Sequence, residues 1–282
     1  MHDLVGATLQ ARLGDGGQRL DILRGDGRLL LTHRAMTDQR PSIHPIVAPD
    51  GQGILTEDAP AHHPWQHGLY TGLNVVNDVG FWKETAQDGT FHPRPIAPPM
   101  VQGGTACWAL ETAWRAPDGT VFITERQDWT LTDHAATFEL GLDWRLHAEV
   151  DLTIGQYMAG GLFLRMPYAD ERGGTAVNSE GQVNDAAEAQ RARWVAVSMP
   201  ITGRDGCAGM AIMDHPSNPD YPVTWRIDHQ LGISPSRCIA GAWHVAKGDV
   251  DRYTYLITVF CGEPDLAALE TRWQTFAADT AL

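Results

Sequence analysis

The chain of 282 residues is poor in cysteine and in basic side chains, and it has no long apolar run. Its four cysteines form no closely spaced pair, which argues against a zinc ribbon or a disulfide scaffold. No stretch of about 18 apolar residues occurs, so no membrane-spanning helix is expected. Lys and Arg number 21 against 35 Asp and Glu, a formal charge of −14. This balance argues against nucleic acid and against an anionic membrane surface as partners.

The N-terminal sequence lacks the basic segment and the apolar core of a signal peptide, so a cytoplasmic location is expected. Neither an internal repeat nor an interdomain linker is evident, which predicts a single domain over residues 1–282. Residues 169–192 are polar and rich in glycine, but they interrupt a continuing series of strands. We interpret them as one long loop of that domain.

Short segments with alternating or continuous apolar residues recur along the chain, bounded by Gly, Pro, Asp and Asn. This pattern predicts an all-β fold, a large β-sandwich. One helix is expected, over Pro264–Ala277, with Pro and Asp at its start and an apolar face that docks on the edge of the sheet. The expected strands are Asp21–Thr32 (a pair around a Gly-Asp-Gly turn), Trp108–Trp114, Val121–Trp129, Ala136–Leu146, Arg193–Met199, Ala208–Met213 and Arg252–Phe260.

The densest chemical signal lies in residues 58–84, where histidines, acidic residues and tryptophans occur together. Imidazoles titrate near neutral pH and can transfer protons. His63 and His67 are therefore candidate catalytic residues, although a lone loop histidine more often only forms hydrogen bonds. Pro64 and Gly68 favour a loop over a helix around them.

Glu84 is the candidate catalytic carboxylate of the same segment. If the chain is extended there, Trp82 and Glu84 point to one face, and an aromatic platform beside a carboxylate suits a sugar. A core position for Trp82 is an equal alternative. Further substrate contacts are predicted from His44, His62, Trp65 and Trp82.

A second cluster, residues 213–228, directly follows a strand that is expected to be buried. Side chains at strand ends are held rigidly, so His215 is a third candidate catalytic residue. Asn218 and Trp225 are candidate substrate-binding residues, with loop structure and core packing as their respective alternatives. We predict that this cluster and residues 58–84 form two walls of one pocket.

Arg165 stands on an otherwise apolar strand, where an unpaired guanidinium is costly. It is predicted either to bind a substrate carboxylate or to pair with an acidic residue inside the protein, and the internal pair is favoured. No cofactor is predicted. A divalent metal is possible, but no HExxH or similar ligand spacing supports it.

The sequences HPWQHGLY, NDVGFW, GGLFLRMP, RARWVAV and MDHPSNPDYPVTWRID occur in this order. They resemble the PmoA-like family, from about His44 to the C-terminal helix. That name refers to a methane monooxygenase subunit, a membrane protein, and the lack of an apolar span argues against that activity. The family is similar to the galactose-mutarotase-like supersandwich of many sugar epimerases, lyases and glycoside hydrolases.

The resemblance implies a site on a concave sheet face where histidines and a carboxylate act as acid and base. Here His63, His67 and His215 match in type, with Glu84 as the carboxylate. A late general-base glutamate of the mutarotase kind is not found, because Glu263 and Glu270 lie at or in the terminal helix.

Three functions are open from the sequence. The first is a carbohydrate-active enzyme that uses histidine acid–base chemistry on a sugar or an oxidised (keto) glycoside, by glycosidic cleavage, β-elimination or epimerisation. The second is a non-catalytic sugar-binding module in which the tryptophans matter most. The third is a metal-dependent sugar enzyme with the histidines as ligands.

Overall fold

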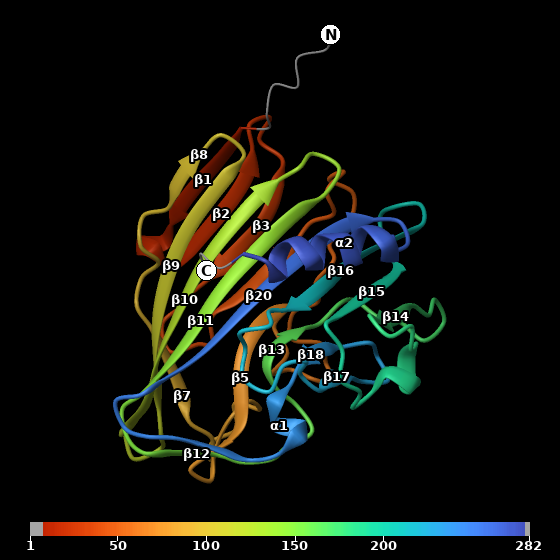
Figure 1. Ribbon diagram of the computed structural model, residues 1–282. Helices are drawn as coiled ribbons and strands as arrows, with labels where there is room; N and C mark the ends of the chain where they lie inside the picture. Colours follow the sequence, from red (N-terminus) through yellow and green to blue (C-terminus); the bar gives the residue numbers. More distant parts are fainter. Residues whose placement is uncertain (1–7, 280–282) are drawn as a thin grey trace.

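The protein is built from two large antiparallel β-sheets that lie face to face, as the computed structural model shows for residues 8–279 (Figure 1). This architecture confirms the predicted all-β sandwich. The strand pair around the Gly-Asp-Gly turn and the hairpin around Ala116–Gly119 both form. No helix in the described part of the chain is long and apolar enough to cross a membrane.

The eleven-stranded sheet carries the N-terminal third of the chain and the strands that flank the densest histidine segment. Its main path, in spatial order, is β1 (Leu9–Gly14), β2 (Arg19–Arg24), β3 (Leu29–Arg34), β4 (Ser42–Ile46), β5 (Leu69–Val76), β13 (Gly160–Leu164), β18 (Ile233–Pro235) and β17 (Trp225–Ile227), with β6 (Val79–Phe81), β12 (Leu152–Ile154) and β19 (Trp243–Val245) beside it.

The nine-stranded sheet holds the longest strands and forms the second layer (Figure 1). Its spatial order is β14 (Thr175–Asn178), β15 (Trp194–Pro200), β16 (Cys207–Asp214), β20 (Val250–Cys261), β11 (Phe138–Ala148), β10 (Val121–Asp133), β9 (Thr105–Arg115) and β7 (Thr90–Pro93), with β8 (Met100–Gln102) also paired to β9.

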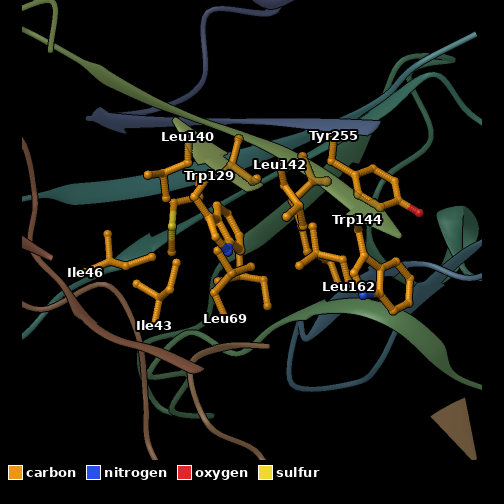
Figure 2. Close-up of a cluster of buried hydrophobic side chains, with 14 of the residues drawn as sticks. Ile43, Ile46, Leu69, Trp129, Leu140, Leu142, Trp144, Leu162 and Tyr255 are labelled. Carbon is orange, nitrogen blue, oxygen red and sulfur yellow. The ribbon is translucent and has the colours of Figure 1, made fainter. Parts of the chain in front are cut away.

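The hydrophobic core fills the space between the two sheets. Along β9, β10 and β11 every second residue is buried, which follows from the period of two along a strand. Figure 2 shows how side chains from both sheets meet, with Leu69 and Leu162 from one sheet facing Leu140 and Trp144 from the other. Each fully buried aliphatic side chain of this kind stabilises the fold by about 1.5–3 kcal/mol.

One carboxylate, that of Glu125 on β10, lies wholly inside this core. It accepts hydrogen bonds from the indoles of Trp144 (2.6 Å) and Trp114 (3.1 Å), from the Gln127 amide (2.9 Å) and from the Thr71 hydroxyl (2.5 Å). All four partners are donors, so both carboxylate oxygens act as acceptors. Because Thr71 belongs to β5, this network ties the centre of one sheet to the other.

The C-terminal helix α2 (Leu266–Ala277) begins as predicted, with the Asp265 side chain accepting from the Ala268 amide at 3.0 Å. Its position differs from the prediction. Instead of docking on a sheet edge, it covers the outer face of the nine-stranded sheet, where Leu269 and Phe276 pack on side chains of β14, β15, β16 and β20 (Figure 1). That face carries apolar residues because a helix shields it from water.

Residues 169–192 are more ordered than a single long loop. They contain β14, which pairs with β15, and a short 3-10 helix, η2 (Asn184–Ala187). Their polar composition reflects an edge position, where one side of the strand is unpaired. The remaining short elements are η1 (Asp15–Gly17) and α1 (Arg237–Ala240).

Candidate functional site

The candidate site is built on the connection between β4 and β5, which folds back on itself. Asp58 and His67 face each other as an isolated β-bridge, and the Ala59 amide donates to the Gln66 carbonyl at 2.7 Å. The predicted loop conformation is therefore correct, with His63 near its tip and His67 at its base. Gly68 allows the chain to enter β5 with a φ of +73°, and a Cβ there would lie 2.6 Å from the Ile43 carbonyl oxygen.

At the base of this loop, five charged or titratable side chains form a continuous series, here called the His67 chain. His67 Nδ1 lies 2.8 Å from Asp58 Oδ1, and His67 Nε2 lies 3.4 Å from Glu84 Oε2. Each carboxylate has its own arginine: Arg34 Nη1 is 2.7 Å from Asp58, and Arg40 Nε is 3.2 Å from Glu84. All five line a pocket of about 390 Å³.

The protonation states of Asp58, Glu84 and His67 follow from their contacts. The hydrogen bond from His67 lowers the pKa of Asp58 to about 2. Burial alone would raise the pKa of Glu84, but the hydrogen bond from His67 and the charge of Arg40 lower it on balance. For His67, burial works against the charged form, yet the bonds to Asp58 and Glu84 raise its pKa. The arrangement thus favours an imidazolium between two carboxylates.

Arg40, which the sequence did not single out, organises the walls of the site. It is buried, its guanidinium donates to the Trp82 carbonyl and lies 3.5 Å from the Trp65 carbonyl, and it stacks 4.9 Å from the Tyr70 ring centre. These contacts join the loop that carries the histidines to the segment that carries Glu84. A buried arginine with a planar set of donors is suited to holding several carbonyl and carboxylate oxygens.

Glu84 reaches the site by a turn. The strand β6 ends at Phe81, and Glu84 has a φ of +57°, so the prediction that Trp82 and Glu84 share the face of a strand is wrong. Trp82 is 4% exposed and packs on Tyr70, while Glu84 turns toward His67. The two residues consequently serve different pockets.

The second pocket, of about 240 Å³ and here called the aromatic pocket, includes Trp65, Trp82 and Phe163 in its lining. Trp65 is half-buried, and Trp82 and Phe163 are buried, with their ring centres 5.5 Å apart. His63 lines the same pocket, and burial together with the charges of Arg165 and His62 lowers its pKa. Its remaining lining residues are Gln66, Lys83, Tyr157, Met158, Ala159, Arg226 and Asp228.

Arg165 has the internal role that the sequence favoured. Its side chain is fully buried, with Nε 3.2 Å from Glu57 and Nη2 2.6 Å from Gln230 Oε1. The same Nη2 lies 2.9 Å from Nε2 of His62. Arg165 thus forms the internal pair, and it lines neither pocket. Arg165 and His62 instead fasten the loop against the turn at Gln230.

Three residues of the second cluster lie away from both pockets. His215 is 7% exposed, has its Nδ1 2.7 Å from Ser217 Oγ and packs against Phe276 of α2. Asn218 is 5% exposed and donates to Asp214 and to the Thr254 carbonyl.

Trp225 is fully buried and donates to the Ala192 carbonyl at 2.9 Å. Asn218 and Trp225 take the positions of their structural alternatives, and neither they nor His215, the predicted catalytic residue of this cluster, line either pocket. Asp214, His215 and Tyr221 contact Trp273 or Phe276 of α2, whereas the end of the cluster lines the aromatic pocket.

That end supplies Asp228, which is 8% exposed and lines the aromatic pocket. One of its oxygens, Oδ1, accepts from the amides of Gln230 and Gly232, both at 2.9 Å. The two sequence clusters thus meet through Arg226 and Asp228 opposite His63 and Trp65.

His44 lies at the edge of the His67 chain. Its Nδ1 is 2.9 Å from the Thr56 hydroxyl, and burial lowers its pKa. Within residues 8–279, no group of three or more His, Cys, Asp or Glu side chains is placed to hold a metal ion.

A family model matches residues 20–274, which is most of the chain. The chain belongs to a family of unknown function, DUF6807. No curated protein matches it. The PmoA-like label finds no support in these comparisons, whereas solved structures of the galactose-mutarotase type are among those similar to this member of DUF6807.

Three such structures illustrate the likeness. A GH36 α-galactosidase from Geobacillus stearothermophilus has 7% identity and a TM-score of 0.43 over 89% of this chain, which spans 40% of that enzyme. A putative aldose 1-epimerase from Klebsiella pneumoniae has 11% identity and a TM-score of 0.42 over 96% of this chain and 88% of its own.

A galactose mutarotase related enzyme from Lactobacillus acidophilus has 10% identity and a TM-score of 0.34, over 89% and 97% of the two chains. Likeness at these scores and identities carries no argument about the ligand or the reaction of the DUF6807 protein.

Proposed function

We propose that this protein is an enzyme that acts on a carbohydrate, with His67 and Glu84 as its acid–base pair. The observation that carries the proposal is the His67 chain, in which one imidazole lies between two carboxylates at a 390 Å³ pocket. Proton transfer needs such groups within reach of a bound substrate. The adjoining aromatic walls support a sugar as the ligand, since sugar rings have apolar faces.

His67 is the acid in this proposal. Asp58 accepts from Nδ1, which holds the ring in place and leaves Nε2 toward Glu84 and the pocket. The raised pKa of His67 keeps the imidazolium available to protonate a sugar oxygen. This oxygen is either the leaving oxygen of a glycosidic bond or the carbonyl oxygen of an oxidised sugar.

Glu84 is the base, because its pKa is lowered and its carboxylate is exposed at the pocket. With a keto sugar, Glu84 takes the proton from the carbon next to the carbonyl. The electron pair of that C–H bond forms a C=C bond while the carbonyl oxygen gains charge. In this proposal Arg40 and the imidazolium of His67, which line the same pocket, stabilise this charge. Loss of the group on the next carbon completes β-elimination, and protonation of the first carbon from its opposite face, by a donor other than Glu84, completes epimerisation.

Incubation of the purified protein with a panel of glycosides and 3-keto-glycosides tests the proposal. His67→Ala and Glu84→Gln should each lower kcat by about 100-fold or more, as expected for the loss of a general acid or base. Unfolding midpoints should report intact folds, and His244→Ala, a change at an exposed histidine on β19, should act as the matched control. Full activity in both site variants would refute the proposal, and sugar binding without turnover of any compound would favour a binding module.

A further inference from the structure

The two pockets share no lining residue and are separated by the segment Trp82–Glu84, here called the wall, whose first two residues line the aromatic pocket and whose third lines the polar one. Consecutive residues face opposite ways across it, with Lys83 lining the aromatic pocket and Glu84 lining the polar one. Arg40 fixes this wall by binding the backbone carbonyls of Trp65 and Trp82 while its Nε meets Glu84. A ligand that crosses the wall would therefore touch both the acid–base pair and the aromatic side chains.

Each compartment is small. The volume of about 390 Å³ is in the lower part of the range of about 300–1,000 Å³ that holds a drug-sized ligand, and the volume of about 240 Å³ is below that range. A single six-membered ring in each compartment suits these volumes better than a large ligand confined to either one.

Two residues that line the aromatic pocket each carry a buried side-chain polar atom without a hydrogen-bond partner. Gln66 is 4% exposed, yet its Oε1 accepts no hydrogen bond, and the same is true of Nδ1 of His63. A buried carbonyl oxygen without a donor is costly and rare in folded proteins. Asp228 adds a carboxylate to this pocket. Its Oδ1 accepts hydrogen bonds from the backbone amides of Gln230 and Gly232.

These acceptors decide the chemistry of the second ring. A purely apolar aromatic group would cover the tryptophans and leave Gln66 Oε1 unpaired. A sugar ring places its C–H face on Trp65 and Trp82 and donates its hydroxyls to Gln66 and Asp228. Lys83, whose Nζ is 5.9 Å from the Trp65 ring centre, closes the rim.

We infer that the aromatic pocket binds a second sugar ring of the same ligand, so that the substrate is a disaccharide or the end of a longer glycan. The reacting ring occupies the polar pocket beside His67 and Glu84, and its neighbour occupies the pocket of Trp65, Trp82 and Gln66. This inference rests on the proposed function, since it extends the same site from one ring to two.

The test compares, for the sugar on which the enzyme is active, its disaccharides with its methyl glycoside and its 4-nitrophenyl glycoside. The measured quantity is the ratio of kcat/KM for the disaccharide to kcat/KM for the methyl glycoside. Gln66→Leu and Trp65→Ala should each lower this ratio by about 10-fold, as expected when a ligand loses a hydrogen bond or a stacking face.

Gln10→Leu is the matched control, since Gln10 is exposed on the edge strand β1, and it should leave the ratio unchanged. Trp65 is only half-buried, so Trp65→Ala keeps the test valid if Gln66→Leu fails to fold.

An unchanged ratio in both site variants, with activity on the methyl glycoside retained, overturns the second sugar ring and leaves the proposed function in place. A preference for the 4-nitrophenyl glycoside that depends on Trp65 but not on Gln66 assigns the pocket to an aromatic group and also overturns it.

If no compound is turned over, tryptophan fluorescence titration with cellobiose, lactose and maltose separates the two claims. Disaccharide binding that is lost in Gln66→Leu and Trp65→Ala supports the two-ring site while catalysis fails. Absence of binding to all three overturns the two-ring site.

Discussion

Replacing Glu125 by glutamine should destabilise the fold by about 3 kcal/mol, although the two side chains have nearly the same shape. The carboxylate receives four hydrogen bonds in the core, and each of its four partners presents a donor to it. A glutamine keeps one acceptor oxygen but replaces the other with an NH₂ group. Oε1 holds three of the four bonds, so the NH₂ group would take the position that faces the Trp114 indole at 3.1 Å.

The magnitude follows from two contributions. Loss of one hydrogen bond to a charged acceptor costs about 1.5–3 kcal/mol, and a buried donor left without a partner costs about 1–3 kcal/mol. These overlap in part, because both concern the Trp114 N–H. The bonds from Thr71, Gln127 and Trp144 survive but become neutral and weaker. A total near 3 kcal/mol is therefore expected.

Urea denaturation followed by circular dichroism measures this loss, and a double-mutant cycle identifies its source. Trp114→Phe removes the indole N–H that opposes the new amide, so the double variant should be more stable than the sum of the single effects by about 1–2 kcal/mol. The reasoning is refuted if Glu125→Gln stays within about 0.5 kcal/mol of the original protein, or if the two changes are additive.

Two further predictions concern the site loop. Asp58→Asn should lower the pKa of His67, as measured by NMR titration of its ring protons, because it removes the carboxylate bonded to Nδ1. In the unaltered protein, Asp58 should stabilise the fold above its unfolded pKa near 3.8, and this contribution should disappear as pH falls to about 2. The contribution of His67 to stability changes with pH in the opposite direction. Because its pKa is raised in the folded protein, it stabilises the fold below pH 6.5, and this contribution is lost as pH rises through the folded pKa. Gly68→Ala should cost about 1–3 kcal/mol through backbone strain, and more through the contact with the Ile43 carbonyl, as measured by urea denaturation.

The Asp58→Asn and Gly68→Ala predictions each have their own control. A His67 pKa that is the same in Asp58→Asn and in the original protein would contradict the hydrogen-bonded chain. For the glycine, Gly119→Ala is the comparison, because Gly119 also has a positive φ, +90°, but no atom within 4 Å of a new Cβ. Equal losses at Gly68 and Gly119 would show that the close contact at Gly68 has no effect.

The strands were predictable from sequence because their signal is local. Alternation from Phe138 to Trp144 and the Asp-Gly turn at residues 118–119 depend only on neighbouring residues. The position of α2 on the nine-stranded sheet was not predictable from the sequence. It depends on which outward positions of β15, β16 and β20 are apolar once these strands are paired.

The site was only partly predictable for the same reason. His67 and Glu84 were singled out because they stand in one dense segment, and Arg40 was missed because its contacts depend on carbonyl groups that only the folded chain brings to it. His215 was misplaced because a strand end can deliver side chains to either side of a sheet, and here it faces Phe276. Asp228 was overlooked although it ends the second cluster, since nothing in sequence distinguishes it from a surface aspartate.

The position of β20 between β16 and β11 has a consequence for synthesis of the chain. Residues 250–261 are translated more than 100 residues after β11, yet they occupy the middle of the nine-stranded sheet. Until they leave the ribosome, both β11 and β16 have an open edge of unpaired backbone groups, which is prone to wrong pairing. The sheet therefore closes in a late step, and slow folding with a need for chaperone protection is the expected behaviour of a nascent chain with this topology.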